Sequence, residues 1–194
     1  IRCGVMAANS HNTQPWKFVI GRDSITIRPD SSRRLEAVDP DDHHLFASLG
    51  CAAENMIQSA EAFGYHADFE FKEDSILLSL SPTKREPSNL FNAVHLRQPT
   101  RSNFDGKTVQ SDKLALLTRS GTGRGVEVHL IDSKAGMEDV LAYILRGNTL
   151  QMKDAAFMRE LRHWVRFNYA DAMSSQDGLF SLCTGNPNVP GWIG

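Results

Sequence analysis

The chain has 194 residues, of which 41% are hydrophobic, and its formal net charge is -2. This length and composition support one globular domain, or two half-sized units that share a core. The charge gives no basic footprint for nucleic acid, and no apolar run approaches the roughly 20 residues that span a bilayer. We therefore expect no nucleic-acid partner and no membrane partner, and a small molecule as the ligand.

The three cysteines, Cys3, Cys51 and Cys183, are widely spaced and include no Cys-x-x-Cys pair. This usage indicates neither a disulfide framework nor a zinc site, and it fits a reducing compartment. We expect a cytoplasmic protein. Because the sequence begins at Ile1 and not at Met, we also expect that the true N-terminus, with any targeting segment, lies outside it.

The first part of the chain predicts a helix end, two hairpins and one long helix. Residues 1–8 are expected to be the last turns of a helix. Alternation at 17–20 and 24–28 predicts one hairpin, and alternation at 67–71 and 75–80 predicts another. Between them, apolar residues at three- and four-residue spacing predict a core helix that Gly64 closes: Leu45, Leu49, Ala52, Met56, Ala60 and Phe63.

An acidic and histidine-rich segment, residues 39–44, precedes that helix. It invites a metal site, but adjacent His43 and His44 lack the spacing that aims two imidazoles at one ion. We instead predict that Asp41 or Asp42 is the helix N-cap, and we predict no metal site. Cys51 is expected to be a small packed side chain and not a nucleophile, since no paired base is evident.

A proline-rich stretch at 81–88 is the best internal boundary, and it predicts two halves, residues 1–84 and 85–194. In the second half we expect helices at 90–97 and 111–119, a loop at 121–125 and a strand at 126–131. From Ala135 the pattern is helical, with a break near Gly147 and Asn148. Trp164 is expected in the core. The tail looks loop-like, and such loops often form lids over active sites.

A polar segment near the start carries the most chemical information. Five consecutive polar side chains, Ser10, His11, Asn12, Thr13 and Gln14, precede Pro15, Trp16 and a strand. We call residues 10–14 the polar loop. Pro15 is expected to hold Gln14 in an extended conformation, so that the donors and acceptors would lie on a rigid segment. By composition alone, a plain solvated loop is the alternative interpretation.

The order Ser-His-Asn-Thr-Gln-Pro-Trp followed by an apolar strand resembles the signature of the FMN-dependent nitroreductase family. In that family this loop runs beside the isoalloxazine ring. The resemblance implies that Ser10, His11, Asn12 and Gln14 lie in the surroundings of the flavin.

A second segment holds two arginines, Arg97 and Arg101, with Phe104 beyond them. Two guanidinium groups in a turn can grip a phosphate through paired hydrogen bonds, although arginine pairs are also common on plain surfaces. The segment resembles the family's phosphate-binding Arg-x-Ser-x-Arg/Lys element. Pro99 stands where the family usually has Ser or Thr, and Thr100 is the candidate for the missing hydroxyl.

In this chain the polar loop comes first and the arginines follow, which resembles a branch of the family with two fused nitroreductase-like halves. The implied fold is α+β, a nitroreductase-like α/β sandwich with a mainly antiparallel central sheet flanked by helices. The implied assembly is an internally duplicated pseudo-dimer, either monomeric or paired as a homodimer.

The function that the resemblance implies is an FMN-dependent oxidoreductase. Hydride would pass from NAD(P)H through FMN to a nitroaromatic, quinone or similar small-molecule electron acceptor. No Ser-His-Asp set or carboxylate pair stands out, so we expect no catalytic residue in the chain and expect the flavin to carry the chemistry. The alternative is a protein that stores or sequesters FMN without turnover.

Overall fold

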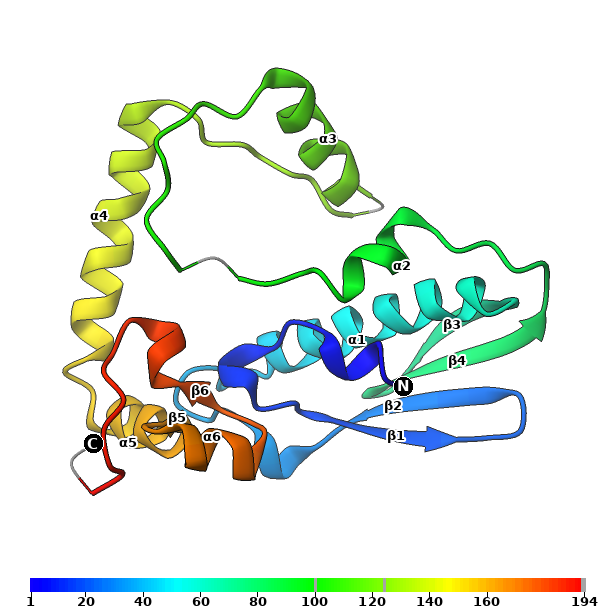
Figure 1. The fold of residues 1–194 in the computed structure, drawn as a ribbon, viewed down its shortest axis with the longest axis horizontal. Helices are drawn as coiled ribbons and strands as arrows, with labels where there is room; N and C mark the ends of the chain where they lie inside the picture. Colours follow the sequence, from blue (N-terminus) through cyan, green and yellow to red (C-terminus); the bar gives the residue numbers. More distant parts are fainter. Residues whose placement is uncertain (100, 124, 193–194) are drawn as a thin grey trace. The chain divides into compact units, whose positions relative to one another are not determined.

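The computed structural model describes residues 1–99, 101–123 and 125–192. The chain groups into two units, one made of Ile1–Arg101 with Arg159–Gly194 and the other of Ser102–Met158 (Figure 1). The predicted division near residue 84 concerns an internal duplication and not these two contact-defined units. It stays a prediction.

The first unit is built on a four-stranded antiparallel sheet. Its strands are β1 (Trp16–Ile20), β2 (Ser24–Pro29), β3 (Tyr65–Lys72) and β4 (Ser75–Pro82), in the order β1-β2-β4-β3. Both predicted hairpins are confirmed, with Phe18 opposite Ile27 in the first and Phe69 opposite Leu78 in the second. The α+β class and the antiparallel sheet are therefore confirmed, while the duplication stays a prediction.

Helix α1 (His43–Ala62) lies against this sheet and supplies half of its core (Figure 1). The predicted stripe is confirmed from Leu45 to Met56, whereas Phe63 is 64% exposed and its predicted core position is wrong. Gly64 follows the helix with a φ of +83°, which glycine adopts without strain. The buried cluster combines one helix face with the inner face of the sheet: Ala7, Trp16, Ile27, Leu45, Leu49, Ala52, Ala53, Met56, Ile76 and Leu78. Cys51 is exposed, so its predicted packing is wrong. One residue away from the buried Ala52, it lies about 100° around the helix.

The segment before β1 is irregular. The predicted helix end at residues 1–8 is only a 3-10 turn, η1 (Gly4–Met6), and a second turn, η2 (Ser10–Asn12), holds the start of the polar loop. After β4 comes α2 (Asn89–Val94), whose first turn is capped by Ser88 through a 3.0 Å bond from the Phe91 amide. This helix is shorter than predicted.

The second unit contains α3 (Ser111–Gly121), α4 (Lys134–Gln151) and the start of α5 (Ala155–Trp164). The strand predicted at 126–131 is wrong, because this segment finds no partner strand among the described residues beyond one isolated bridge between Gly123 and Val126. The predicted break at Gly147 is also wrong. A glycine costs a helix interior only about 1 kcal/mol, and α4 continues through it.

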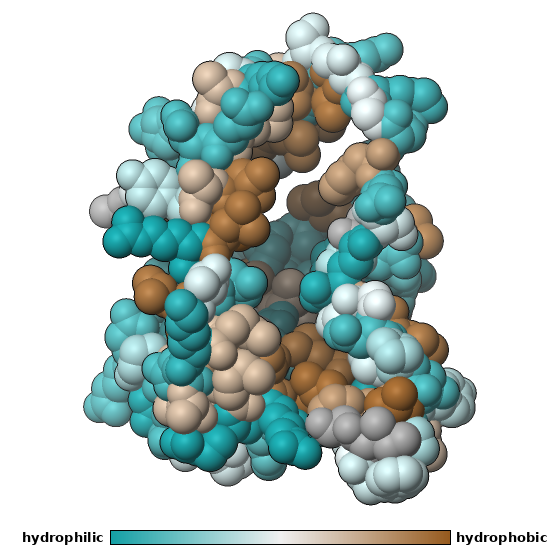
Figure 2. Space-filling view, turned by 90° about the vertical axis from the view of Figure 1, so that its left-hand side faces the viewer, coloured by the Kyte–Doolittle hydropathy of each residue, from teal (hydrophilic) through white to brown (hydrophobic). Residues whose placement is uncertain are grey.

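Apolar side chains of the second unit reach the surface. Five of them recur at three- and four-residue spacing along α4 and are 39% to 59% exposed: Met137, Val140, Leu141, Ile144 and Leu145. Hydrophobic surface is visible on the face drawn in Figure 2. Within the residues described, none of the helices is both long and apolar enough to cross a bilayer.

The tail returns to the first unit. It forms β5 (Val165–Arg166), α6 (Tyr169–Ser175), β6 (Leu179–Phe180) and η4 (Ser181–Thr184), with β5 and β6 paired in parallel. Trp164 is 6% exposed, so its predicted core position is confirmed. Residues 185–192 are loop-like, as expected, but α6, β6 and η4 before them form a small folded segment. The turn at residues 176–178 within that segment meets the polar loop.

Candidate functional site

The polar loop has an unusual backbone. His11, Asn12 and Gln14 have φ angles of +49°, +51° and +52°, a region that costs residues other than glycine about 1 to 3 kcal/mol each and costs asparagine least. The extended conformation predicted for Gln14 is therefore wrong. The Gln14 amide donates to Oδ1 of Asn9 at 2.8 Å, and this bond closes the loop on itself. Such a backbone persists only where surrounding contacts hold it.

Three consecutive tail residues, Gln176, Asp177 and Gly178, supply those contacts, and we call them the clasp. The Gln14 side-chain amide donates to the Gln176 carbonyl at 2.6 Å, and the Gly178 amide donates to the Asn12 carbonyl at 3.0 Å. Gly178 has a φ of +77°, and a Cβ there would collide with the Trp164 carbonyl. Only glycine therefore fits at this position, where the clasp passes close to the backbone of Trp164.

Between these two bonds lies an ionic cluster. Arg33 donates to the Thr13 carbonyl at 2.7 Å and to Oδ2 of Asp177 at 2.9 Å, while Arg166 donates to Oδ1 of Asp177 at 2.6 Å. Burial alone raises the pKa of the Asp177 carboxyl, but the hydrogen bonds from Arg166 and Arg33 outweigh burial and hold that pKa below its ordinary value. Asp177 is therefore a carboxylate that pairs with both guanidinium groups, and Arg33 links it to the loop.

His11 is the one ring in the loop. Burial lowers the pKa of His11, and the nearby Glu160 carboxylate partly offsets this effect, so burial favours the neutral imidazole. Glu160 itself accepts the amides of Ala37 and Val38 at 2.9 and 3.0 Å. The buried Nδ1 of His11 has no hydrogen-bond partner within the described residues. A buried polar atom without a partner is a group that a ligand could satisfy.

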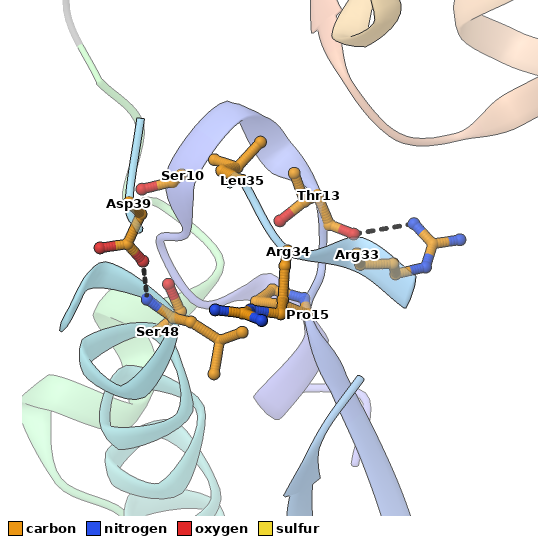
Figure 3. A pocket seen from close by; sticks show the side chains of 9 residues that line it. Ser10, Thr13, Pro15, Arg33, Arg34, Leu35, Asp39 and Ser48 are labelled. Atoms are coloured by element: carbon orange, nitrogen blue, oxygen red, sulfur yellow. Dashed lines mark hydrogen bonds between the residues drawn. The ribbon is translucent and has the colours of Figure 1, made fainter. Parts of the chain in front are cut away.

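A small cavity lies beneath the loop, lined by side chains of the loop, of residues 33–39 and of α1 (Figure 3). Its volume is about 10 Å³, which is room for about one water molecule and far too little for a flavin ring. Figure 3 shows the Arg33 side chain directed to the Thr13 carbonyl. The cavity belongs to the support of the loop and is not a cofactor pocket.

The side chains predicted to meet the flavin differ in their surroundings. Asn12 is exposed, whereas Ser10, His11 and Gln14 are half-buried and Thr13 is buried. The structure thus keeps an amide at the surface of the polar loop, where a ligand can reach it. A flavin site at these residues stays a prediction.

Of the two arginines of the second segment, Arg97 contacts the entry to the polar loop. One guanidinium nitrogen of Arg97 donates to the Met6 carbonyl at 2.9 Å, four residues before Ser10. Arg101 is exposed. Thr100 lies outside the described residues. The structure therefore brings Arg97 to the segment that leads into the polar loop, and a phosphate role for the arginines stays a prediction.

The acidic segment before α1 has a structural role. Asp39 accepts the amides of His44 at 2.9 Å and Leu45 at 2.8 Å, whereas Asp42 occupies the N-cap position without a side-chain cap bond and pairs with Arg34 at 2.6 Å. The predicted N-cap position is therefore confirmed at Asp42, but the side chain that accepts the first-turn amides is that of Asp39. Across the described ranges, no three metal-ligating side chains gather at one point.

Sequence reasoning missed the residues that hold the loop: Asn9, Arg33, Arg166, Gln176, Asp177 and Gly178. The pairing of Arg33 with Asp177 joins residues 144 positions apart, and no local pattern predicts such a contact. The Asp-Gly dipeptide at 177–178 was a turn signal, since glycine readily takes the positive φ found there. It did not reveal which segment the turn would meet.

Comparison with known proteins places the chain near one named group. No protein-family model matches it. It is 24% identical over 169 residues to two proteins from two strains of Mycobacterium tuberculosis, both of which carry the name "Putative NAD(P)H nitroreductase". The match covers 82% of this chain and 48% of each relative, so the chain spans about half the length of these curated relatives. Its similarity to nitroreductases is thus distant but extends over most of the chain.

Proposed function

We propose that the protein is an FMN-dependent oxidoreductase of the nitroreductase kind, which uses NAD(P)H to reduce a nitroaromatic, a quinone or a similar acceptor. The observation that carries this proposal is the polar loop, whose backbone is held at positive φ while its Asn12 amide stays exposed. The distant relatives named as NAD(P)H nitroreductases support the same reaction class.

The donor set of the loop and the arginine element fits FMN chemically. A flavin ring presents carbonyl and ring-nitrogen acceptors, which match the amide of Asn12 and the imidazole of His11. Nδ1 of His11 has no hydrogen-bond partner among the described residues, which supports a polar ligand atom at this position. The phosphate matches the guanidinium groups of Arg97 and Arg101, which are both exposed.

The residues of this chain would bind and orient the cofactor. When bound, FMN supplies hydride chemistry, accepting a hydride from the nicotinamide and returning electrons to the acceptor. Donors from Asn12 and Gln14 would stabilise negative charge on the pyrimidine edge of the ring, because their dipoles are already oriented before the charge develops. Neutral His11 can either donate or accept at that edge. Arg97, Arg101 and the candidate Thr100 would hold the phosphate.

A fluorescence titration tests the binding part of this proposal. We expect the protein to quench the fluorescence of added FMN, and the Asn12→Gly variant to bind both FMN and riboflavin about tenfold more weakly, because a hydrogen bond is worth roughly 1 kcal/mol or more. Glycine is chosen because it keeps the positive φ of residue 12 without strain. The change therefore removes the amide and leaves the backbone.

The control is Asn188→Gly, which removes an exposed amide from the tail. It should bind both flavins as the unchanged protein does. A protein that leaves FMN fluorescence unquenched, or an Asn12→Gly variant with unaltered affinity for both flavins, would contradict the assignment of the loop.

A further inference from the structure

We propose that the clasp, residues 176–178, sets the conformation in which the polar loop meets its ligand, with Asp177 as the positioning residue. The inference rests on the proposed function for its effect on flavin. Its structural part concerns the protein alone.

The clasp and the loop pair residue by residue in opposite directions. Asn12 bonds to Gly178 and Gln14 bonds to Gln176. Between them, the Thr13 carbonyl reaches Asp177 through the Arg33 guanidinium, which donates to both. Three consecutive loop residues are thus fixed by three consecutive clasp residues. This order resembles an antiparallel strand pair with one side chain inserted into the ladder.

The central contact, between Asp177 and the guanidinium groups of Arg33 and Arg166, is the one whose loss should disturb the loop most. The side chains of Asp177 and Arg166 are 12% and 16% exposed, and that of Arg33 is 35% exposed. Removing one charge from such a cluster leaves the partner charges without compensation in a site that water only partly reaches. Arg33 then loses the partner that orients it toward the Thr13 carbonyl, and the positive-φ loop loses the central one of its three contacts with the clasp.

A consequence follows from thermodynamic reciprocity. If the clasp favours the ligand-ready loop, then a ligand on the loop must favour the docked clasp by the same factor. The segment from β5 to β6 would then report on ligand binding although none of its side chains is assigned a ligand contact. Docking of the tail and affinity for flavin are thereby coupled.

Hydrogen exchange in the ligand-free protein tests the structural part. We expect Asp177→Asn to raise the exchange rates of amides in residues 9–15 and 176–180 by about tenfold or more, and to leave the amides of β2 and β4 unchanged. The matched control is Asp42→Asn, which makes the same chemical change in another ion pair of 2.6 Å, between Asp42 and Arg34. It should leave the exchange of residues 9–15 unaltered.

Equal exchange of the loop in Asp177→Asn and in the unchanged protein would overturn the proposal. A uniform rise that includes β2 and β4 would overturn it too, because it would mean global destabilisation. If Asp177→Asn does not fold, Arg33→Gln replaces it. That variant removes the bonds to both Thr13 and Asp177 and keeps the carboxylate paired with Arg166.

Flavin titrations test the functional part, at a temperature well below the melting point of every variant. Asp177→Asn should weaken FMN and riboflavin by the same factor, about tenfold, because the loop is assigned to the ring and not to the phosphate. A purely structural role would lower the melting temperature and leave the affinity of the folded protein unchanged. Unchanged affinity in Asp177→Asn would therefore overturn the positioning role.

The two proposals fail in different ways. If the unchanged protein does not bind FMN, the proposed function is wrong and the positioning of a flavin falls with it. If the unchanged protein binds FMN and Asp177→Asn binds it equally well, the clasp alone is wrong.

Discussion

Replacing Arg97 and Arg101 together with alanine is expected to weaken FMN binding by roughly 3 kcal/mol or more, which is a hundredfold or more in the dissociation constant. Each charged hydrogen bond to a phosphate contributes about 1.5 to 3 kcal/mol. Riboflavin lacks the phosphate, so its affinity should hardly change. The measurement is a pair of fluorescence titrations with the two flavins.

The fold should tolerate this double change. In the structure Arg97 gives one exposed hydrogen bond, to the Met6 carbonyl, and such a bond contributes little net stability. Replacing Arg22 and Arg119, two exposed arginines that belong to neither the polar loop nor the segment of Arg97 and Arg101, removes the same charge and should leave both flavins bound as before. Equal losses for FMN and riboflavin in the Arg97 and Arg101 variant would mean that these arginines do not hold the phosphate.

Replacing Asp39 with alanine should lower the free energy of unfolding at pH 7 by about 2 to 3 kcal/mol. The Asp39 residue is 4% exposed, and its carboxylate accepts the amides of His44 and Leu45 in the first turn of α1. Without it, two amides at the start of the main core helix lose their acceptor. Urea unfolding measures the difference. Asp41→Ala is the control, since Asp41 gives only a long, exposed contact of 3.4 Å to the His43 amide.

The Asp39 effect should depend on pH in a defined direction. Burial raises the pKa of Asp39, but the amides of His44 and Leu45 outweigh burial, so its pKa in the folded protein lies below the ordinary value. The stabilisation is thus fully present above the unfolded pKa of about 3.9 and is lost as the pH falls through the lower folded value. The gap between the unchanged protein and Asp39→Ala should shrink below about pH 4. A gap that is the same at pH 3 as at pH 7 would contradict this account.

Local periodicity was enough to predict both hairpins and α1. Apolar and polar residues alternate along the strands, which turn at short polar segments, and α1 carries an apolar stripe that packs against the sheet. These features depend on residues within a few positions of each other, so a single sequence contains them. The strand predicted at 126–131 had a similar pattern but no neighbouring strand to pair with among the described residues.

The contacts that hold α1 and the polar loop in place were not predictable, because they join residues outside any local pattern. Asp39 caps α1 from three residues ahead of the N-cap, and Asp177 reaches Arg33 across 144 positions. The positive φ of Gln14 also runs against local preference, since a residue directly before a proline favours an extended backbone. Contacts with Asn9 and Gln176 hold it there. Tertiary contacts overrode local propensity at the residues assigned to the ligand, where such departures are expected.

The most direct test of the central claim is anaerobic mixing of the FMN-loaded protein with NADH or NADPH while the visible absorbance of the flavin is followed. The account predicts that the absorbance bleaches at a rate that saturates with nicotinamide concentration, and that adding a quinone or a nitroaromatic restores it. A flavin that stays bound and fully oxidised with both nicotinamides would contradict the oxidoreductase and would favour a protein that stores FMN.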